Sequence, residues 1–341
     1  MLLLVLNKIN HFETYEFINF VNATVNLSVK SKNRINVNQL QKIVNDFQPD
    51  IIHSHLFAAE IVSRSLYYPK VKWFSHFHNK VPQFQNLRWQ SLFKKNDLTA
   101  FFEKKHLLNR YKVNGGNHFI SISQDTTKFI NKVVSNDFQI FELNNAINFN
   151  KFHTNNKRTY TAKLRIINVG SFQKLKNQKL LVSIANILNE KNIDFEIIFL
   201  GQGEEFNNVK RLVCIYRLEN NIQFLGLVNN VEKYLEKSDL YVHTAYSEAF
   251  GLVLVEAMAA GLPVITLDGK GNRDIIEEGK NGYMIFEQDA EKFAETIINL
   301  WNDKQKMKEI SAFANEFAKQ YDIVNYVDKL LELYQNAINS K

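Results

Sequence analysis

The sequence predicts an α/β protein of two domains, each built on a parallel sheet that helices cover on both faces. Apolar runs of strand length recur along the chain, helical patterns separate most of them, and a polar stretch at residues 148–163 divides the two series. Strands that alternate with helices form βαβ units, and such units make parallel sheets. With 341 residues, the chain is long enough for two domains with cores of their own.

The second half shows this alternation most clearly. We expect strands at Leu164–Val169, Phe195–Leu200, Ile222–Leu225, Leu240–His243, Pro263–Leu267 and Tyr283–Phe286. We expect helices at residues 178–191, 204–217, 229–236, 252–260 and 289–301. The helix that begins near Leu252 has a clear end, because Gly261 suits a left-handed cap and Pro263 cannot continue the helix.

The first half repeats the pattern. We expect strands at Leu2–Leu6, Thr24–Ser28, Asp50–His53, Val71–His76, His118–Ile122 and Phe138–Leu143, and helices at residues 37–47, 56–66, 86–110 and 125–134. The predicted domains are therefore residues 1–150 and 151–322, both Rossmann-like, with a helix at about 323–341 that packs back on the first. In open parallel sheets, ligands bind beyond the carboxyl ends of the strands, so we expect two domains that face each other across a ligand-binding cleft.

Composition excludes several protein classes. The sequence is 45% apolar and 23% charged, which is typical of a globular protein, and no apolar run reaches the roughly 18 residues of a membrane-spanning helix. The N-terminal residues lack the basic region and cleavage site of a signal peptide, so we interpret Leu2–Leu6 as a buried strand. The single cysteine, Cys214, rules out an intrachain disulfide and a cysteine metal cluster, and it fits a reducing, cytoplasmic location.

The positive charge is concentrated in one segment. Residues 1–150 hold 18 Lys and Arg against 10 Asp and Glu, whereas the rest holds 24 against 25. The excess lies in residues 80–112, where aromatic residues interleave with eight basic ones. Such a segment can lie on an anionic membrane surface, here the inner face, with about 1 kcal/mol from each basic residue. The alternative is a solvated helix whose aromatic residues pack inward. We expect no nucleic-acid partner, because no nucleic-acid motif accompanies the charge.

The most informative motif is Ser247–Val264, in which two glutamates flank the start of a predicted helix. If the helix begins near Gly251, the N–H groups of Gly251 and Leu252 lack helical partners and, with the helix dipole, form a site for a phosphate or diphosphate. Glu256 can accept hydrogen bonds from a ribose diol, and Glu248 can hold a hydroxyl of a donor sugar. The alternative is an amphipathic helix with one solvent-facing glutamate and an unrelated glutamate in the loop.

A second motif follows the first predicted strand of the second half. Gly170 and Ser171 come directly after that strand, and Lys174 and Lys176 precede the next helix. This pattern suits a diphosphate, because an ammonium group offsets the charge that grows on a leaving nucleoside diphosphate. The alternative is an ordinary loop with exposed lysines.

Two H-x-H pairs occur at strand ends in the first half, His53 with His55 and His76 with His78. Side chains two residues apart in a strand share a face, which is one requirement of a metal site. No third ligand set with zinc-like spacing and no D-x-D motif accompanies them, so we expect no metal ion. We expect instead that a histidine at a strand end orients the acceptor hydroxyl or the reacting sugar. The alternative is histidines satisfied near the core.

The sequence lacks the Walker A, G-x-S-x-G and G-x-G-x-x-G motifs, which argues against a P-loop NTPase, an α/β-hydrolase and a standard NAD enzyme. The motifs that are present resemble family 4 retaining glycosyltransferases, which have the GT-B fold. Glu248 and Glu256 match the family's E-x7-E pattern, and Val169–Asn177 matches its phosphate loop. The other matches, in the family's order along nearly the whole chain, are Pro49–His55, His76–Asn79, Ile120–Ser123, Asn144–Asn148, Gly201–Gly203, Phe224–Gly226 and Asn281–Gly282.

The resemblance implies roles for these residues. Glu256 would bind the ribose, Glu248 the transferred sugar and Lys176 the diphosphate. His78, with His76 second, would lie near the reacting centre. The other residues that the resemblance places at the substrate are Gly251, Leu252, Phe250, Gly170, Ser171, Lys174, Gly201 and Gly226.

The resemblance also implies a reaction. The chain would transfer a sugar with retention from a UDP- or GDP-sugar to a glycan or lipid-linked acceptor, without a metal ion or other cofactor. An envelope polysaccharide or lipopolysaccharide is the expected product. A different class of function is a non-catalytic sugar-nucleotide-binding subunit of a glycosylation complex. A GT-B epimerase would need other acids, and nothing specific in the sequence favours it.

Three departures from the family pattern bear on this choice. Ser171 stands where the family usually has arginine, and loss of that charge-assisted contact costs on the order of 1.5–3 kcal/mol unless Lys174 replaces it. Ala249 stands where the family usually has glycine, which makes a positive φ less favourable. The sequence has no glycine before Gly115, so we expect that the family's opening strand, glycine-rich loop and helix are missing. The alternative is that Leu2–Leu6 is that first strand, followed by a decayed loop.

Overall fold

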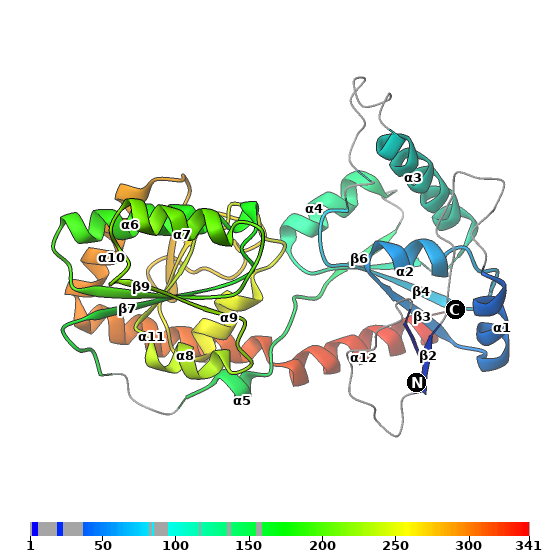
Figure 1. Cartoon of the computed structure of the whole chain (residues 1–341). Helices are drawn as coiled ribbons and strands as arrows, with labels where there is room; N and C mark the ends of the chain where they lie inside the picture. The colour runs from blue at the N-terminus through cyan, green and yellow to red at the C-terminus, as the bar shows by residue number, and fades with distance from the viewer. Residues whose placement is uncertain are drawn as a thin grey trace. The chain divides into compact units, whose positions relative to one another are not determined.

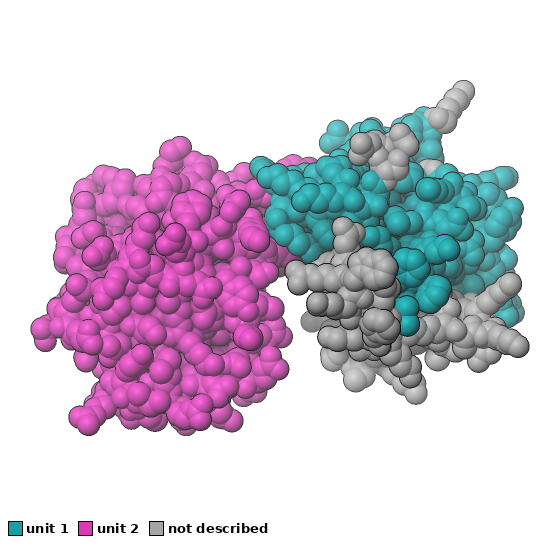
Figure 2. All heavy atoms as spheres, turned by 90° about the horizontal axis from the view of Figure 1, so that it is seen from above, with its two compact units in different colours: residues 1–143, 330–341 teal, residues 144–329 magenta. Residues whose placement is uncertain are grey.

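The computed structural model describes residues 2–5, 19–22, 37–81, 84, 95–115, 117–134, 138–154 and 159–340 (Figure 1). The chain forms two compact units, shown in different colours in Figure 2. Unit 1 is residues 1–143 with 330–341, and unit 2 is residues 144–329. The last helix, α12 (Ile323–Asn339), begins in unit 2 and ends in unit 1. In the part of the chain described, no helix is both long and apolar enough to cross a membrane.

Unit 2 is built on a six-stranded parallel sheet, as predicted. The strands are β7 (Leu164–Val169), β8 (Phe195–Leu200), β9 (Ile222–Gly226), β10 (Leu240–His243), β11 (Val264–Leu267) and β12 (Gly282–Ile285). Their order across the sheet is β12-β11-β10-β7-β8-β9. The chain therefore moves outward from β7 to β9 and then returns to the other side of β7 with β10. This reversal between β7 and β10 is a topological switch point, and ligands bind at such points in open sheets.

Helices cover both faces of this sheet. One face carries α6 (Gln178–Glu190), α7 (Phe206–Ile215) and α10 (Ala290–Asn302). The other carries α5 (Phe149–Phe152), α8 (Val231–Lys237), α9 (Leu252–Ala259) and α11 (Lys304–Ala318) (Figure 1). The sequence analysis does not predict α11. Its buried stripe is Met307, Ile310, Ala314 and Ala318, and half of that stripe is alanine, which gives a weak apolar signal.

Unit 1 contains a four-stranded parallel sheet in the order β3-β4-β5-β6, and a separate parallel pair, β1-β2. The strands are β1 (Leu2–Val5), β2 (Asn19–Asn22), β3 (Ile51–His55), β4 (Lys72–Phe77), β5 (Asn117–Ser121) and β6 (Gln139–Glu142). The helices are α1 (Asn38–Phe47), α2 (Leu56–Ser63), α3 (Lys95–Val113) and α4 (Gln124–Val133). The sequence does not predict β2. The expected strand Thr24–Ser28 and residues 86–94 of an expected helix lie outside the described residues.

The two faces of the unit 1 sheet have different partners because side chains alternate along a strand. Trp73, Phe77 and Phe119 join the core formed with residues of α2, α3 and α4. On the other face, Phe74 packs edge-on against Tyr334 of α12, with ring centroids 4.9 Å apart. Lys72 also donates a hydrogen bond of 2.8 Å to the backbone oxygen of Ser340. The C-terminal helix thus covers the face that Phe74 shares with the histidines of β3 and β4.

A buried polar network stabilises the first face. Arg64 is fully buried, lies between the rings of Trp73 and Tyr111, and pairs with Glu60 at 3.0 Å. Glu60 accepts a hydrogen bond of 2.6 Å from Ser75. It also accepts one from the hydroxyl of Ser54. The charges of Glu60 and Arg64 are thus paired with each other and hydrogen-bonded. Because Ser54 lies on β3 and Ser75 on β4, the network holds these two strands in register.

Candidate functional site

The two predicted motifs of unit 2 follow β7 and β10, the neighbouring strands at the switch point. Their loops are bonded to each other through the backbone. The N–H of Tyr246 donates to the oxygen of Leu175 at 3.1 Å, and the Thr244 hydroxyl donates to the oxygen of Lys176 at 3.2 Å. The carboxyl ends of β7 and β10 therefore form one continuous polar surface.

Glu248 is at the centre of this surface. Its Oε1 lies 2.8 Å from Nε2 of His243, the last residue of β10, and it forms an ion pair with Nζ of Lys176. The backbone holds the loop as well, since the Glu248 N–H donates to the oxygen of Gly269 at 2.9 Å. A Cβ at Gly271 would collide with the carbonyl oxygen of Ala249, so only glycine allows this close approach of the two loops.

These contacts keep Glu248 ionised. Burial raises the pKa of its carboxyl, but the hydrogen bond from His243 and the electrostatic attraction of His243 and Lys176 outweigh burial and hold the pKa at about 2. At neutral pH the carboxylate therefore only accepts hydrogen bonds. It can bind a sugar hydroxyl, and it cannot act as a general acid.

His243 is a site residue that the sequence analysis missed. Its side chain is 2% exposed, and its Nδ1 lies 3.4 Å from the hydroxyl of Tyr241. That hydroxyl donates to the backbone oxygen of Val169 at 3.1 Å. A chain of contacts thus connects the end of β7 to Glu248. The sequence could have indicated this role, because His243 ends a predicted strand and ligands bind at the carboxyl ends of strands in this fold class.

The second glutamate has different surroundings. Glu256 is half-buried on α9, and burial raises the pKa of its carboxyl while the charge of Lys151 lowers it. Within the described ranges, no side chain forms an ion pair with Glu256. Its carboxylate is therefore free to accept hydrogen bonds from the two hydroxyls of a diol.

Helix α9 begins where the motif predicts. Gly251 precedes it with φ of 103°, a conformation that favours glycine, and Leu252 is the first helical residue. The N–H groups of the first turn lack intrahelical partners, which makes the helix start suitable for an anion. Phe250 is 2% exposed and packs against Tyr321 at a centroid distance of 5.6 Å. Its side chain therefore packs inside the protein and supports the loop.

The glycines at the carboxyl ends of β7, β8 and β9 pack against one another. The N–H of Gly170 donates to the oxygen of Leu200 at 2.9 Å, and that of Gly201 to the oxygen of Gly226 at 2.7 Å. Gly201 has φ of 135°, and a Cβ there would collide with the oxygen of Gly170. The structure thus gives Gly201 a packing role, and this role keeps the phosphate loop close to its neighbours.

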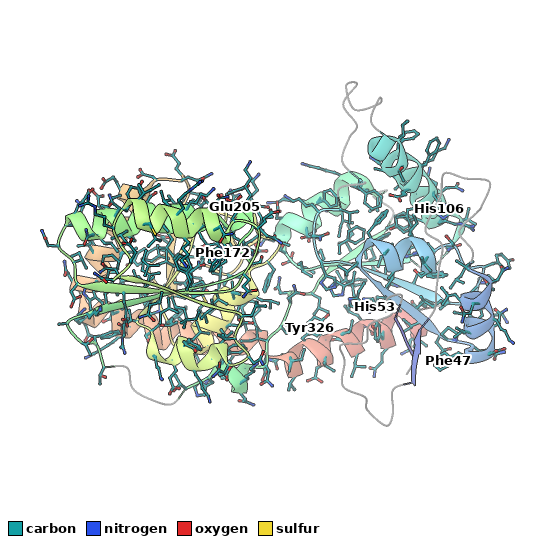
Figure 3. The ribbon with its side chains drawn as sticks, in the orientation of Figure 1. Phe47, His53, His106, Phe172, Glu205 and Tyr326 are labelled. Atoms are coloured by element: carbon teal, nitrogen blue, oxygen red, sulfur yellow. The ribbon has the colours of Figure 1, made fainter. Side chains whose placement is uncertain are left out.

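The phosphate loop itself is anchored by a buried ring and carries exposed polar residues. Phe172, which is labelled in Figure 3, lies in the aromatic core of unit 2. Its ring centroid is 5.2 Å from that of Phe206 and 6.0 Å from that of Phe224. Ser171 and Lys174 are exposed, whereas the side chain of Lys176 is 20% exposed and faces Glu248. The structure thus brings Lys176 and Glu248 together and leaves Lys174 on the surface.

In unit 1, the structure brings the two H-x-H pairs together. Register places His55 beside His76, and Nδ1 of His55 lies 2.8 Å from Nε2 of His78. The rings of His76 and His78 stack with centroids 4.3 Å apart. His78 also lines a small pocket at the end of β4, whose other lining residues include Leu56, Phe57, Asn79 and Phe84.

Burial controls the protonation of these histidines. It lowers the pKa of His53 to about 3 and of His55 to about 4, with further lowering from neighbouring histidines. Burial also lowers the pKa of His76 and of His78. All four imidazoles are therefore neutral at pH 7. Each then has one N–H donor and one nitrogen with a free lone pair.

Comparison with known proteins identifies the fold. Residues 150–317 match the family Glycosyl transferases group 1. A poly(glycerol-phosphate) alpha-glucosyltransferase of Bacillus subtilis is 26% identical over 241 residues, which are 67% of this chain and 36% of that protein. The chain thus spans about a third of the length of this relative.

Solved structures resemble the whole chain. A glycosyltransferase from Rickettsia africae has a TM-score of 0.76 at 19% identity, over 95% of this chain and 86% of that one. The Anabaena protein HepE, solved with UDP and glucose, has a TM-score of 0.72 at 19% identity, over 93% and 86%. The chain therefore has the fold of these structures, two Rossmann-like α/β units of the GT-B type, and its residues 150–317 match the glycosyl transferases group 1 family.

Proposed function

We propose that this chain transfers a sugar from a nucleoside diphosphate sugar to a glycan or lipid-linked acceptor, with retention and without a required metal ion. The observation that carries the proposal is the contact of Glu248 with Lys176 and His243 at the switch point of unit 2. This arrangement places an ionised sugar-binding carboxylate beside a phosphate-binding ammonium. A nucleotide sugar needs those two groups close together, because its diphosphate is bonded directly to its sugar.

The donor is a UDP- or GDP-sugar in this proposal. The diphosphate lies at the start of α9, where the N–H groups of Gly251 and Leu252 and the dipole favour an anion. Lys176 offsets the charge that develops on the leaving diphosphate. Glu256, one turn into α9, accepts the two ribose hydroxyls. HepE, a protein of similar fold that was solved in complex with UDP and glucose, supports this class of donor.

Glu248 binds a hydroxyl of the transferred sugar. Its low pKa keeps the carboxylate charged at physiological pH, so its hydrogen bond to the sugar is charge-assisted and strong. We further propose that His243 positions Glu248, since the contact at 2.8 Å fixes one carboxylate oxygen and leaves the other for the sugar. His78, with His76 second, acts at the reacting centre, as the resemblance implies.

The acceptor belongs to an envelope polysaccharide or lipopolysaccharide. The Bacillus subtilis relative, a poly(glycerol-phosphate) alpha-glucosyltransferase, supports a polymeric acceptor. We also propose that the protein is cytoplasmic and works at the inner membrane face through the basic segment 80–112. Within its described part, Phe101 is 45% and Phe102 46% exposed, and both border a surface depression with Lys104, Lys105 and Lys112. Exposed rings beside lysines suit an anionic membrane surface.

A turnover assay tests the reaction. The wild-type chain is incubated with UDP- and GDP-sugars, and release of the nucleoside diphosphate is followed with and without EDTA. The proposal predicts release that persists in EDTA and disappears in Glu248→Gln. Nucleotide binding that remains intact without any turnover would instead support a non-catalytic sugar-nucleotide-binding subunit, which is the alternative function that the Ser171 departure favours.

A further inference from the structure

We propose that His53, His55 and His76 form a binding site for a transition-metal ion of the Zn²⁺ class. One ring nitrogen from each of these histidines lies within 4.8 Å of the others. The sequence predicted no metal ion, because no third ligand set with zinc-like spacing and no D-x-D motif accompanies the two H-x-H pairs. The parallel register of β3 and β4 supplies it, since His55 pairs directly with His76 across the two strands.

Three ring nitrogens of the group are buried without a hydrogen-bond partner. His76 is 3% exposed, and neither of its ring nitrogens has a hydrogen-bond partner. The Nε2 of His53 is also buried without a partner. Buried polar groups are normally hydrogen-bonded, so two such histidines side by side require an explanation. A shared metal ion accounts for one nitrogen of each histidine, because it accepts one lone pair from each ring.

A second layer of contacts orients the ligands. Nδ1 of His53, which is labelled in Figure 3, is hydrogen-bonded to the hydroxyl of Tyr334 on α12. This bond leaves Nε2 as the nitrogen that can coordinate, which is the usual arrangement of a metal-binding histidine. On the opposite face of the strands, Glu60 binds Ser54 and Ser75, so the backbone that carries the three rings is held in place.

The donor atoms of the group also suit a metal of this class, because a neutral imidazole is a common ligand of Zn²⁺. Three imidazole ligands select Zn²⁺, Co²⁺, Ni²⁺ or Cu²⁺ over Mg²⁺ and Ca²⁺, which prefer oxygen. A tetrahedral ion takes four ligands. His78 contacts His55, and its imidazole can therefore be the fourth ligand.

The metal site shares His76 with the proposed reacting centre, but metal binding can be measured independently of the transfer reaction. Only its effect on turnover rests on the proposed function: an ion on His76 removes that residue from the reacting centre, so we expect Zn²⁺ to slow transfer and EDTA to restore it. Binding is measured without any substrate. A failure of the metal site therefore leaves the transferase proposal intact, and the reverse also holds.

The test uses the full chain without a histidine tag, titrated with Co²⁺. Tetrahedral Co²⁺ absorbs visible light strongly, and Zn²⁺ should displace it. We expect one Co²⁺ per chain in the wild type and in His106→Ala, a control histidine on α3. We expect no band in His76→Ala or His55→Ala. Tyr334→Phe, which keeps all ligands, should weaken binding about 10-fold to 100-fold.

Two results would overturn the site. One is a wild-type chain that binds no Co²⁺ or Zn²⁺ at stoichiometric concentrations. The other is a band that is unchanged in His55→Ala and in His76→Ala. Because His55 is only partly covered by the protein, His55→Ala keeps the core intact and decides the question if circular dichroism shows that His76→Ala is unfolded.

Discussion

Glu248 and Glu256 belong to one motif, but the loop and the helix that carry them place them in opposite electrostatic surroundings. Glu248 lies against His243 and Lys176, and these contacts hold its pKa at about 2. Glu256 is half-buried on α9, and burial raises its pKa. Ionisation of Glu248 therefore increases the free energy of unfolding, whereas ionisation of Glu256 decreases it in the protein without ligand. This difference shows that a shared sequence motif does not imply a shared energetic role.

Turnover gives the largest expected effect. Glu248→Gln keeps the size of the side chain and removes its charge, so the hydrogen bond to the sugar is no longer charge-assisted. We expect nucleoside diphosphate release to fall by about a hundredfold or more. The matched control is Glu277→Gln, which removes an exposed carboxylate paired with Lys280 and should leave turnover unchanged. Equal rates in the two variants would remove Glu248 from the reaction.

Stability gives the next effect, and it depends on pH. The pKa of Glu248 is lower in the folded than in the unfolded chain, so the carboxylate adds stability above pH ~4.5 and loses it as pH falls toward 2. In urea unfolding at pH 7, Glu248→Gln should lose roughly 3 kcal/mol. The difference from the wild type should shrink steadily between pH 5 and pH 3. A difference that is constant over this range would contradict the assigned contacts.

Glu256→Gln should act in the opposite direction. Because its folded pKa is raised, ionisation of Glu256 above its unfolded pKa costs stability, and the neutral glutamine removes that cost. At pH 7 we expect the variant to be about 0.5–1 kcal/mol more stable than the wild type in urea. Destabilisation would mean that Glu256 has a structural partner, and the comparison of the two glutamates would then fail.

The smallest effect tests how Glu248 is positioned. Tyr241→Phe removes only the hydroxyl that lies between His243 and the oxygen of Val169. We expect the acid limb of the pH–rate profile to move to higher pH, because His243 is held less firmly and stabilises the Glu248 carboxylate less. The free energy of unfolding should fall by about 1 kcal/mol, as for one lost hydrogen bond. A lower rate with an unmoved acid limb would give Tyr241 a purely structural role.

Much of unit 2 could be predicted from the sequence. Its strands lie within one residue of their expected bounds, because buried parallel strands appear as apolar runs between glycine turns. The start of α9 at Leu252 was predicted for the same reason that it forms, since Gly251 adopts a positive φ. Strand bounds and helix starts of this kind depend on residues that are neighbours in the chain, so the sequence predicts them.

Contacts across strands were harder to predict. The approach of His243 to Glu248, and that of His55 to His76, depends on the curvature of a loop and on strand register, neither of which follows from spacing along the chain. The position of Arg64 was equally hard to predict, because arginine side chains are mostly exposed. Here Arg64 is fully buried between Trp73 and Tyr111. The chemistry of a site therefore depends most on the part of the fold that sequence patterns describe least.

The central claim is that unit 2 binds a nucleoside diphosphate where β7 and β10 end, with Glu256 on the ribose. Calorimetric titration of UDP and GDP into the wild type, Glu256→Gln and Glu277→Gln tests it most directly. Loss of a charge-assisted hydrogen bond costs about 1.5–3 kcal/mol, so Glu256→Gln should bind about 10-fold to 100-fold more weakly while Glu277→Gln matches the wild type. Equal affinities in all three proteins, or no binding of either nucleotide to the wild type, would contradict the claim.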